Sequence, residues 1–184
     1  MDNVNPVAGL ERKFCALGEG LALGEDAVIE GHASLWGLAD QSGDIVQRGA
    51  YGGSLARLAA EGRRVKLLWQ HDPARPIGVW DTVREDERGL YVRGRLLTET
   101  QGGREAAALL AAGAIDGLSI GYRTVRAEKS GTGRLLTELE LWEVSLVTFP
   151  MLPQARVAPG AGGADPAPDE DLVAMISAAR EMLA

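Results

Sequence analysis

The sequence predicts an α+β fold built on a mainly antiparallel sheet or barrel that is flanked by helices. Between residues 27 and 149 most segments have strand character, either as alternating apolar and polar residues or as compact apolar runs. Turn-forming residues separate several of these segments as in hairpins, and only two helical segments interrupt them. No GxGxxG motif or phosphate loop joins a strand to a helix, so a doubly wound nucleotide-binding fold has no support.

The first predicted elements are a strand and a short helix. Residues 27–36, AVIEGHASLW, alternate roughly as on a half-buried strand. A turn-rich loop then leads to a helix predicted over residues 53–62, with Ser54 as its N-cap and Gly62 as its C-terminal stop.

Three strands are predicted around a proline-containing break. Residues 65–71, VKLLWQH, form an apolar run that is typical of a strand covered on both faces. The prolines of residues 72–76, DPARP, interrupt this run, and a further strand is predicted over residues 77–86. Residues 89–97 alternate well and follow the turn EDERG, which indicates a hairpin.

A second helix and a long strand region complete the predicted core. Residues 98–115 carry Ala and Leu at helical spacing, and Gly113 closes this predicted helix. Residues 117–129 return to strand character. Residues 134–149 form one long strand or two consecutive strands, which Pro150 stops.

The chain divides into one central domain and two terminal segments. Residues 1–26 show no clear period and are expected to be a mobile N-terminal segment. Residues 27–157 form the predicted domain. Residues 158–184 combine a linker rich in small residues, 158–171, with a short amphipathic helix, 170–183.

Composition narrows the classes of function. The 184 residues carry 19 basic and 26 acidic side chains, a net charge of −7, which argues against broad affinity for nucleic acid. No apolar run approaches the roughly 20 residues that cross a bilayer, and the N-terminus lacks the order of a signal peptide, so a cytoplasmic location is expected. Two histidines and one cysteine, Cys15, are too few for a convincing zinc site, and no metal or cofactor is predicted.

Two residues in the middle of the chain could carry chemistry. His71 ends an apolar strand and opens a proline-bounded loop, a common place for catalytic side chains, although a packing or capping histidine is the more frequent case. Ser119 lies between Gly117 and Gly121, a spacing similar to that of a nucleophile elbow. An elbow follows a strand, whereas this serine follows a helix, so an α/β-hydrolase is disfavoured. The glycines would let backbone approach a reacting carbonyl; the alternative is a tight helix-to-strand connection.

A carboxylate completes the candidate set. Glu143 lies in the apolar strand LWEVSLVTF, so it must face solvent, as is more usual, or have a partner. Strand alternation puts Trp142 and Val144 on one face and Glu143 and Ser145 on the other. A serine, a histidine and a carboxylate are the groups that acyl transfer needs, because the serine attacks, the imidazole takes its proton and the carboxylate fixes the imidazole tautomer.

Four segments together resemble the prohead (capsid maturation) serine proteases of tailed phages and gene transfer agents. They are an opening strand and loop, a histidine motif "H…piG", a serine motif "lS.G(Y/F)" and a closing motif "l.EvS.V..Pa...A.v". In this chain they read GHASLWGLADQSGDIVQRGAY, VKLLWQHDPARPIGVW, AIDGLSIGYRTV and LTELELWEVSLVTFPMLPQARV. They occur in the family's order and span roughly residues 29–157. The closing motif departs from the usual Pro-Ala-Asn, because Met151 and Leu152 follow Pro150.

The resemblance implies a fold and a set of roles. The fold would be similar to that of the herpesvirus assemblins. Carried over by position, Ser119 would be the nucleophile, His71 the general base and Glu143 the third, less certain member of the triad. Herpesvirus relatives have a second histidine in that third place, but His32 lies outside any matching motif and receives no role.

The resemblance also implies a setting and leaves two rivals open. The substrate would be major capsid protein or its scaffold segment, cleaved inside the immature capsid in the host cell, with the enzyme as a homo-oligomer such as a dimer. On composition alone, the linker 158–171 is a candidate self-cleavage region because it is rich in small residues, and the terminal amphipathic helix is a candidate for docking on shell or scaffold. The rivals are a catalytically silent capsid scaffold or assembly factor on the same fold, and an esterase-like serine hydrolase on another fold.

Overall fold

The computed structural model describes residues 11–15 and 27–149. It confirms the predicted α+β class, with two helices, α1 (Gly52–Ala60) and α2 (Gln101–Ala111), and one sheet. The strands are β1 (Glu11–Cys15), β2 (Val28–Leu35), β3 (Ile45–Val46), β4 (Lys66–Trp69), β5 (Asp72–Glu85), β6 (Gly89–Leu96), β7 (Gly117–Ser130) and β8 (Gly133–Val147).

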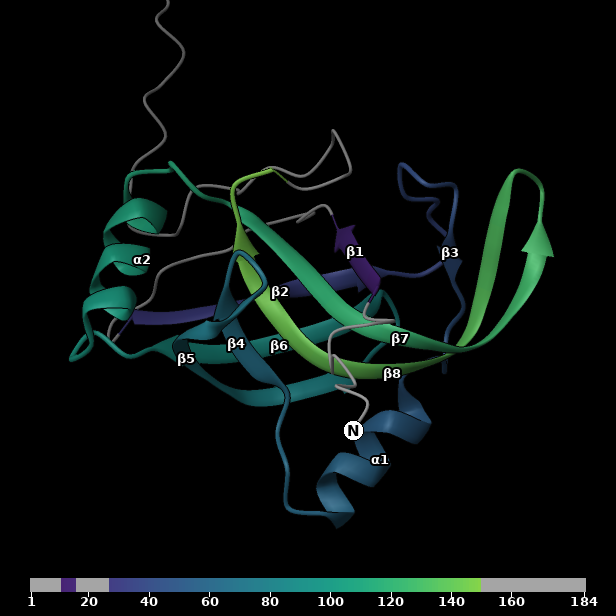
Figure 1. Cartoon of the computed structure of the whole chain (residues 1–184), viewed down its shortest axis with the longest axis horizontal. Helices are drawn as coiled ribbons and strands as arrows, with labels where there is room; N and C mark the ends of the chain where they lie inside the picture. Colours follow the sequence, from purple (N-terminus) through teal and green to yellow (C-terminus); the bar gives the residue numbers. More distant parts are fainter. Residues whose placement is uncertain (1–10, 16–26, 150–184) are drawn as a thin grey trace, which may run out of the picture.

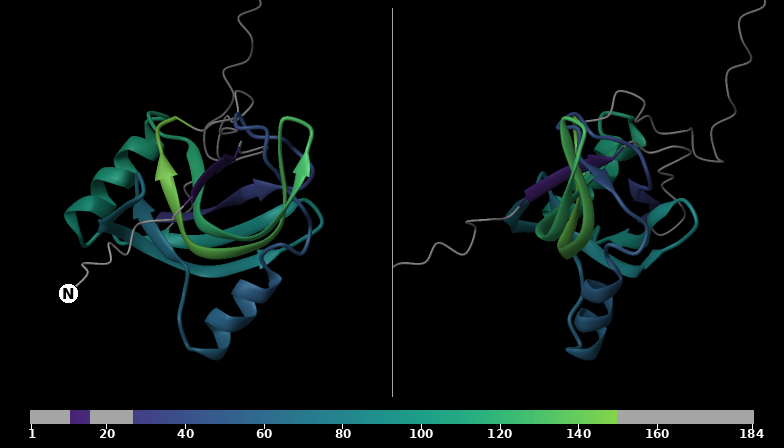
Figure 2. Two further views of the ribbon diagram at one scale, coloured as in Figure 1. Left: turned by 45° about the vertical axis from the view of Figure 1, so that its right-hand side comes forward. Right: turned by 90° about the vertical axis from the view of Figure 1, so that its right-hand side faces the viewer.

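The sheet is curled and mostly antiparallel. Its strand order is β1-β7-β8-β4-β5-β6-β2, with β3 paired to β8 outside this path. The end strands β1 and β2 contact each other, so the sheet bends into a half-barrel, with α2 and α1 at separate places on its outside (Figures 1 and 2). Both β3 and β4 run parallel to β8, and the sequence did not predict these two parallel pairings.

The hairpin of β7 and β8 separates an apolar face from a polar one. On one face, Leu118 and Ile120 lie opposite Leu146 and Val144, and all four are fully buried in the core. Since side chains alternate along a strand, the intervening residues of both strands lie on the other face. These are Ser119, Gly121, Glu143 and Ser145, with Ser119 opposite Ser145 and Gly121 opposite Glu143.

Helix α1 fills a gap beside β8. Strand β3 pairs with β8 as far as Leu136 and β4 begins at Glu143, so the edge between them has no strand partner. The N–H of Leu141 donates instead to the hydroxyl of Ser54 on α1, at 2.9 Å. The prediction that Ser54 caps the helix was therefore wrong, because Tyr51 is the N-cap and Ser54 serves β8.

The predicted helix ends are largely confirmed. Gly62 has a φ of +64° and Gly113 a φ of +66°, the left-handed conformation that favours glycine at a helix C-terminus. The predicted second helix began at residue 98, whereas α2 begins at Gln101, because the hydroxyl of Thr100 accepts from the N–H of Gly103 and caps the helix.

Two strand boundaries differ from the prediction. Strand β1 lies within residues 1–26, where no element was predicted; its backbone pairs with β7, so five residues suffice without a strong pattern of their own. Strand β5 begins at Asp72 and includes Pro73 and Pro76, since its pairing with β4 shifts register on both sides of Leu68 and such irregularities tolerate proline.

Parts of the chain carry predictions that the structure does not address. Pro150, the predicted linker 158–171 and the predicted helix 170–183 lie outside the described residues. In the part that is described, no helix is long and apolar enough to span a membrane.

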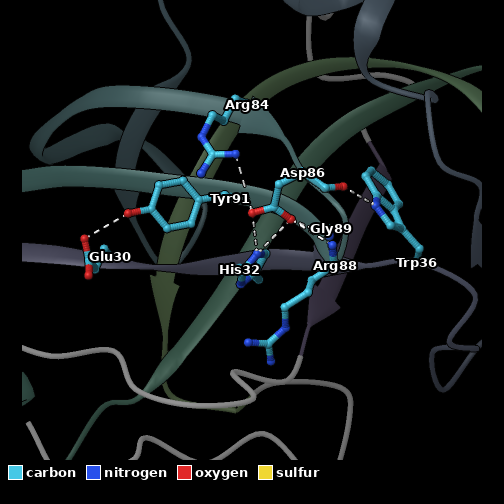
Figure 3. A network of polar contacts seen from close by, with 8 residues as sticks. All are labelled: Glu30, His32, Trp36, Arg84, Asp86, Arg88, Gly89 and Tyr91. Carbon is cyan, nitrogen blue, oxygen red and sulfur yellow. Dashed lines mark hydrogen bonds and ion pairs between the residues drawn. The ribbon is translucent and has the colours of Figure 1, made fainter.

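The turn between β5 and β6 is tied to β2 by a hydrogen bond between Asp86 and His32 (Figure 3). The carboxylate of Asp86 accepts from the ring Nε2 of His32 at 2.9 Å and from the backbone N–H groups of Arg88 and Gly89. Burial acts to raise the pKa of Asp86, but these hydrogen bonds outweigh it and hold the pKa below its ordinary value of 3.8. His32 thus has a structural partner, away from His71.

We predict that Ser54→Ala lowers the free energy of unfolding by about 1–3 kcal/mol, because it leaves a buried N–H of β8 unsatisfied. Urea denaturation measures this change. Ser42→Ala, in an exposed loop, is the matched control and should leave the value unchanged. Equal stability of the two variants would contradict the proposed role of Ser54.

A second prediction concerns acid. Because the folded-state pKa of Asp86 is lowered, its ionised form adds stability above the unfolded pKa, and this is lost as pH falls through the folded value. Asp86→Asn keeps the turn's acceptor oxygen but lacks the charge. Thermal unfolding should show wild type more stable than the variant at neutral pH, with the difference shrinking below pH 3.8. A difference independent of pH would refute the ionic contribution.

Candidate active site

A bulge in β8 places Glu143 in the polar face of the hairpin. Gly121 pairs with Glu143, but the next residue, Tyr122, pairs with Leu141, so Trp142 is an extra residue in the strand. Such a bulge breaks alternation and re-aims the neighbouring side chains. Trp142 is accordingly 44% exposed, although simple alternation grouped it with the buried Val144. Glu143 is only 4% exposed, so it needs a partner.

His71 is held in an unusual turn at the end of β4. Gln70 and His71 have φ angles of +52° and +62°, which cost L-residues roughly 1–2 kcal/mol each. Hydrogen bonds to β8 hold this turn: the N–H of Gln70 donates to the carbonyl of Leu146 at 2.9 Å, and the N–H of His71 donates to the hydroxyl of Ser145 at 3.1 Å. The strained turn therefore directs the imidazole toward the polar face of β8.

The imidazole of His71 and the carboxylate of Glu143 form a buried pair. The distance from His71 Nδ1 to Glu143 Oε1 is 2.6 Å, and the side chains are 3% and 5% exposed. A carboxylate only accepts, so Nδ1 carries the proton of this bond. A neutral imidazole in this tautomer has its lone pair on Nε2, the form in which histidine acts as a general base.

Ser145 lies between these two groups. Its hydroxyl donates to Glu143 Oε2 at 2.5 Å and accepts from the N–H of His71. It is fully buried. The sequence suggested no role for this serine, because a position on the same strand face as Glu143 does not by itself indicate a function. The contact of Ser145 with His71 arises only from the pairing of β4 with β8.

Gly121 makes room for the carboxylate. A Cβ atom at Gly121 would lie 2.0 Å from Glu143 Oε1, a distance that no side chain tolerates. The sequence pointed to Gly121 as a site of close approach to a reacting carbonyl. In the folded chain the group that approaches it is the side chain of Glu143.

Ser119 lies beside this cluster on the neighbouring strand. It pairs directly with Ser145 and is two residues from Gly121, so its side chain shares their face. It is fully buried near the start of β7, within the strand that the sequence predicted over residues 117–129. The three predicted residues thus come from three adjacent strands or strand ends. His71 and Glu143 are in direct contact, and Ser119 lies opposite Ser145, which is hydrogen-bonded to both of them.

Among the described residues, no three His, Cys, Asp or Glu side chains gather closely enough to hold a metal ion. Near the start of β5, the guanidinium of Arg75 lies over the ring of Trp69 and pairs with Glu105 of α2 at 3.7 Å, which joins this part of the strand to that helix.

Comparison with known proteins agrees with this architecture and confirms the resemblance carried by the four motifs. Residues 18–167 match the family of the Caudovirus prohead serine protease. The prohead protease of Enterobacteria phage HK97 is 34% identical over 139 residues, which cover 73% of this chain and 60% of that protein. The chain therefore spans less than two thirds of that relative's length.

Among solved structures, the bacteriophage T4 capsid assembly protease superposes with a TM-score of 0.62 at 15% identity, covering 77% of this chain and 98% of that one. This likeness shows a shared fold. With the family match spanning most of its length, the chain belongs to the Caudovirus prohead serine protease family.

Proposed function

We propose that this chain is a serine endopeptidase that cleaves capsid or scaffold protein during prohead maturation, within the assembling capsid in the host cell. The observation that carries the proposal is the buried 2.6 Å hydrogen bond between His71 and Glu143, with Ser119 on the same face of the adjacent strand. A buried histidine–carboxylate pair beside a serine is the arrangement that acyl transfer uses.

The proposed reaction begins at Ser119. Its Oγ attacks the scissile carbonyl and forms a C–O bond, while its proton passes to His71 Nε2. The imidazolium then protonates the leaving amine as the C–N bond breaks, which leaves an acyl-enzyme. Water, deprotonated by the same nitrogen, releases the acid and restores the serine. Glu143 holds Nδ1–H throughout and stabilises the positive charge on the ring.

Ser145 is a poorer nucleophile than Ser119. Its hydrogen is donated to Glu143 and its lone pair accepts from the backbone of His71. An attack by Ser145 would break both bonds and leave a buried N–H of the strained turn without its acceptor. The serine motif and the position of Ser119 opposite Ser145 therefore support Ser119 as the proposed nucleophile.

The substrate class rests on family membership. The HK97 relative is named a prohead protease, and the T4 structure is that of a capsid assembly protease. Capsid or scaffold protein is therefore the substrate that we propose for this chain.

The roles of the triad lead to a graded prediction. Ser119→Ala should abolish labelling by a serine-directed phosphonate and cleavage of co-expressed major capsid protein. Glu143→Gln should lower kcat by roughly 10⁴-fold, because an amide that donates to Nδ1 moves the ring proton to Nε2 and removes the base. Intact-mass spectrometry locates the label, and gel analysis follows capsid cleavage.

Ser34→Ala is the control for these variants. Ser34 is a fully buried strand serine whose hydroxyl has no hydrogen-bond partner among the described residues, and it lies away from His71. It should label and cleave as wild type does. A wild-type chain that neither labels at Ser119 nor cleaves capsid protein would instead support an assembly factor without catalysis. Hydrolysis of small esters without capsid cleavage would support an esterase.

A further inference from the structure

We infer that Ser145 is a positioning residue for the proposed reaction, and that Gly121 provides the space in which it acts. Together they fix the carboxylate of Glu143 at one orientation relative to His71. This inference rests on the proposed function, because it assigns how the base of that mechanism is held.

The first argument is that one hydroxyl joins the two halves of the pair. A serine hydroxyl has one hydrogen to donate and lone pairs to accept. In Ser145 the hydrogen goes to Glu143 Oε2, while a lone pair receives the N–H of His71. A third hydrogen bond, from His71 Nδ1 to Glu143 Oε1, completes a closed cycle of hydrogen bonds among the three residues. Any rotation of Glu143 or movement of the His71 backbone therefore breaks a hydrogen bond to Ser145.

The second argument comes from the ladder between β4 and β8. These strands pair in parallel up to Trp69 and Leu146, and Gln70 adds one more backbone bond to the carbonyl of Leu146. The chain then turns through two left-handed residues and leaves the ladder. At His71 the Ser145 side chain provides the acceptor that a strand carbonyl would otherwise supply. Ser145 thus holds the backbone of His71 against β8 at the point where the hydrogen bonds between the strands end.

The third argument concerns the opposite side of the carboxylate. Oε2 of Glu143 is held by Ser145, and Oε1 is held by His71. The same Oε1 lies over Gly121, where a Cβ would be 2.0 Å away, and Cδ and Cγ of Glu143 would also be within 3 Å of it. The carboxylate is therefore held by a hydroxyl and an imidazole, and it lies against a glycine where a larger residue would displace it.

A purely structural role for Ser145 makes a different prediction. If the residue only stabilised the fold, its loss would lower the unfolding temperature but leave each folded molecule equally reactive. If it positions the base, folded molecules react more slowly. A misplacement of about 1 Å can cost a reaction roughly 10²-fold in rate, so the two cases are well separated.

The test measures the rate of Ser119 phosphonylation by a fluorophosphonate in the full chain, normalised to folded protein. We expect Ser145→Ala to react about 10²-fold more slowly than wild type. Ser34→Ala, which also removes a buried strand hydroxyl, should react at the wild-type rate. If Ser145→Ala does not fold, Ser145→Cys replaces it, since a thiol keeps the shape but is a weaker donor.

A glycine pair tests the space beneath the carboxylate. Gly121→Ala should slow labelling to a similar degree, because the new methyl group displaces Glu143. Gly53→Ala in α1 is the control: a Cβ there meets nothing closer than 3.8 Å, so labelling should not change.

A spectroscopic readout detects the bond itself. Proton NMR should show a downfield resonance from the His71 Nδ1–H that is lost in His71→Asn and kept in His32→Asn; the chain has no other histidine. In Ser145→Ala this resonance should shift or broaden, whereas Ser34→Ala should leave it in place.

The outcomes separate this inference from the proposed function. Absence of Ser119 labelling in the wild type would overturn the function itself. Labelling of the wild type, together with wild-type rates in folded Ser145→Ala or Cys and in Gly121→Ala, would overturn the positioning role and leave the function standing. An unchanged Nδ1–H resonance in Ser145→Ala would likewise overturn it.

Discussion

The buried carboxylate of Glu143 is the group around which this part of the fold is organised. Taking an unpaired carboxylate out of water costs several kcal/mol, so its position in β8 demands donors. His71 and Ser145 supply them, and each is present because of a backbone arrangement: a strained turn after β4 for the histidine, and the alternation of β8 for the serine. A side chain at Gly121 would push this carboxylate away from its donors.

Strand β8 connects most of these features. Its first part pairs with β3, its last part with β4, and helix α1 satisfies the edge between them through Ser54. The bulge at Trp142 separates the two parts and turns Glu143 away from the core. A site built on paired strands is held more precisely than one built on loops, which suits the proposed reaction, since its rate would depend on fractions of an ångström.

Local signals in the sequence predicted local structure. Helices end at Gly62 and Gly113 as predicted, because each of these positions needs a left-handed backbone conformation that a single glycine provides. The contact of His71 with Glu143 spans 72 positions and follows from the parallel pairing of β4 with β8, which no local pattern encodes. For the same reason, local patterns predict no role for Ser145. The residues alone favour a solvent-facing Glu143, and only the family resemblance predicts that it has a role in the site.

The burial that strengthens this cluster also restricts it. In a low-dielectric interior the hydrogen bonds among His71, Glu143 and Ser145 gain strength, and their geometry is well defined. Ser119 is fully buried as well, so a peptide carbonyl can reach it only if covering atoms move aside. The pairing of β4 and β7 with β8 holds the backbone of all four residues, since His71 follows β4 closely. In the mechanism proposed above, the hydrogen bonds among His71, Glu143 and Ser145 are in place before a substrate binds, and the atoms that cover Ser119 are those that move.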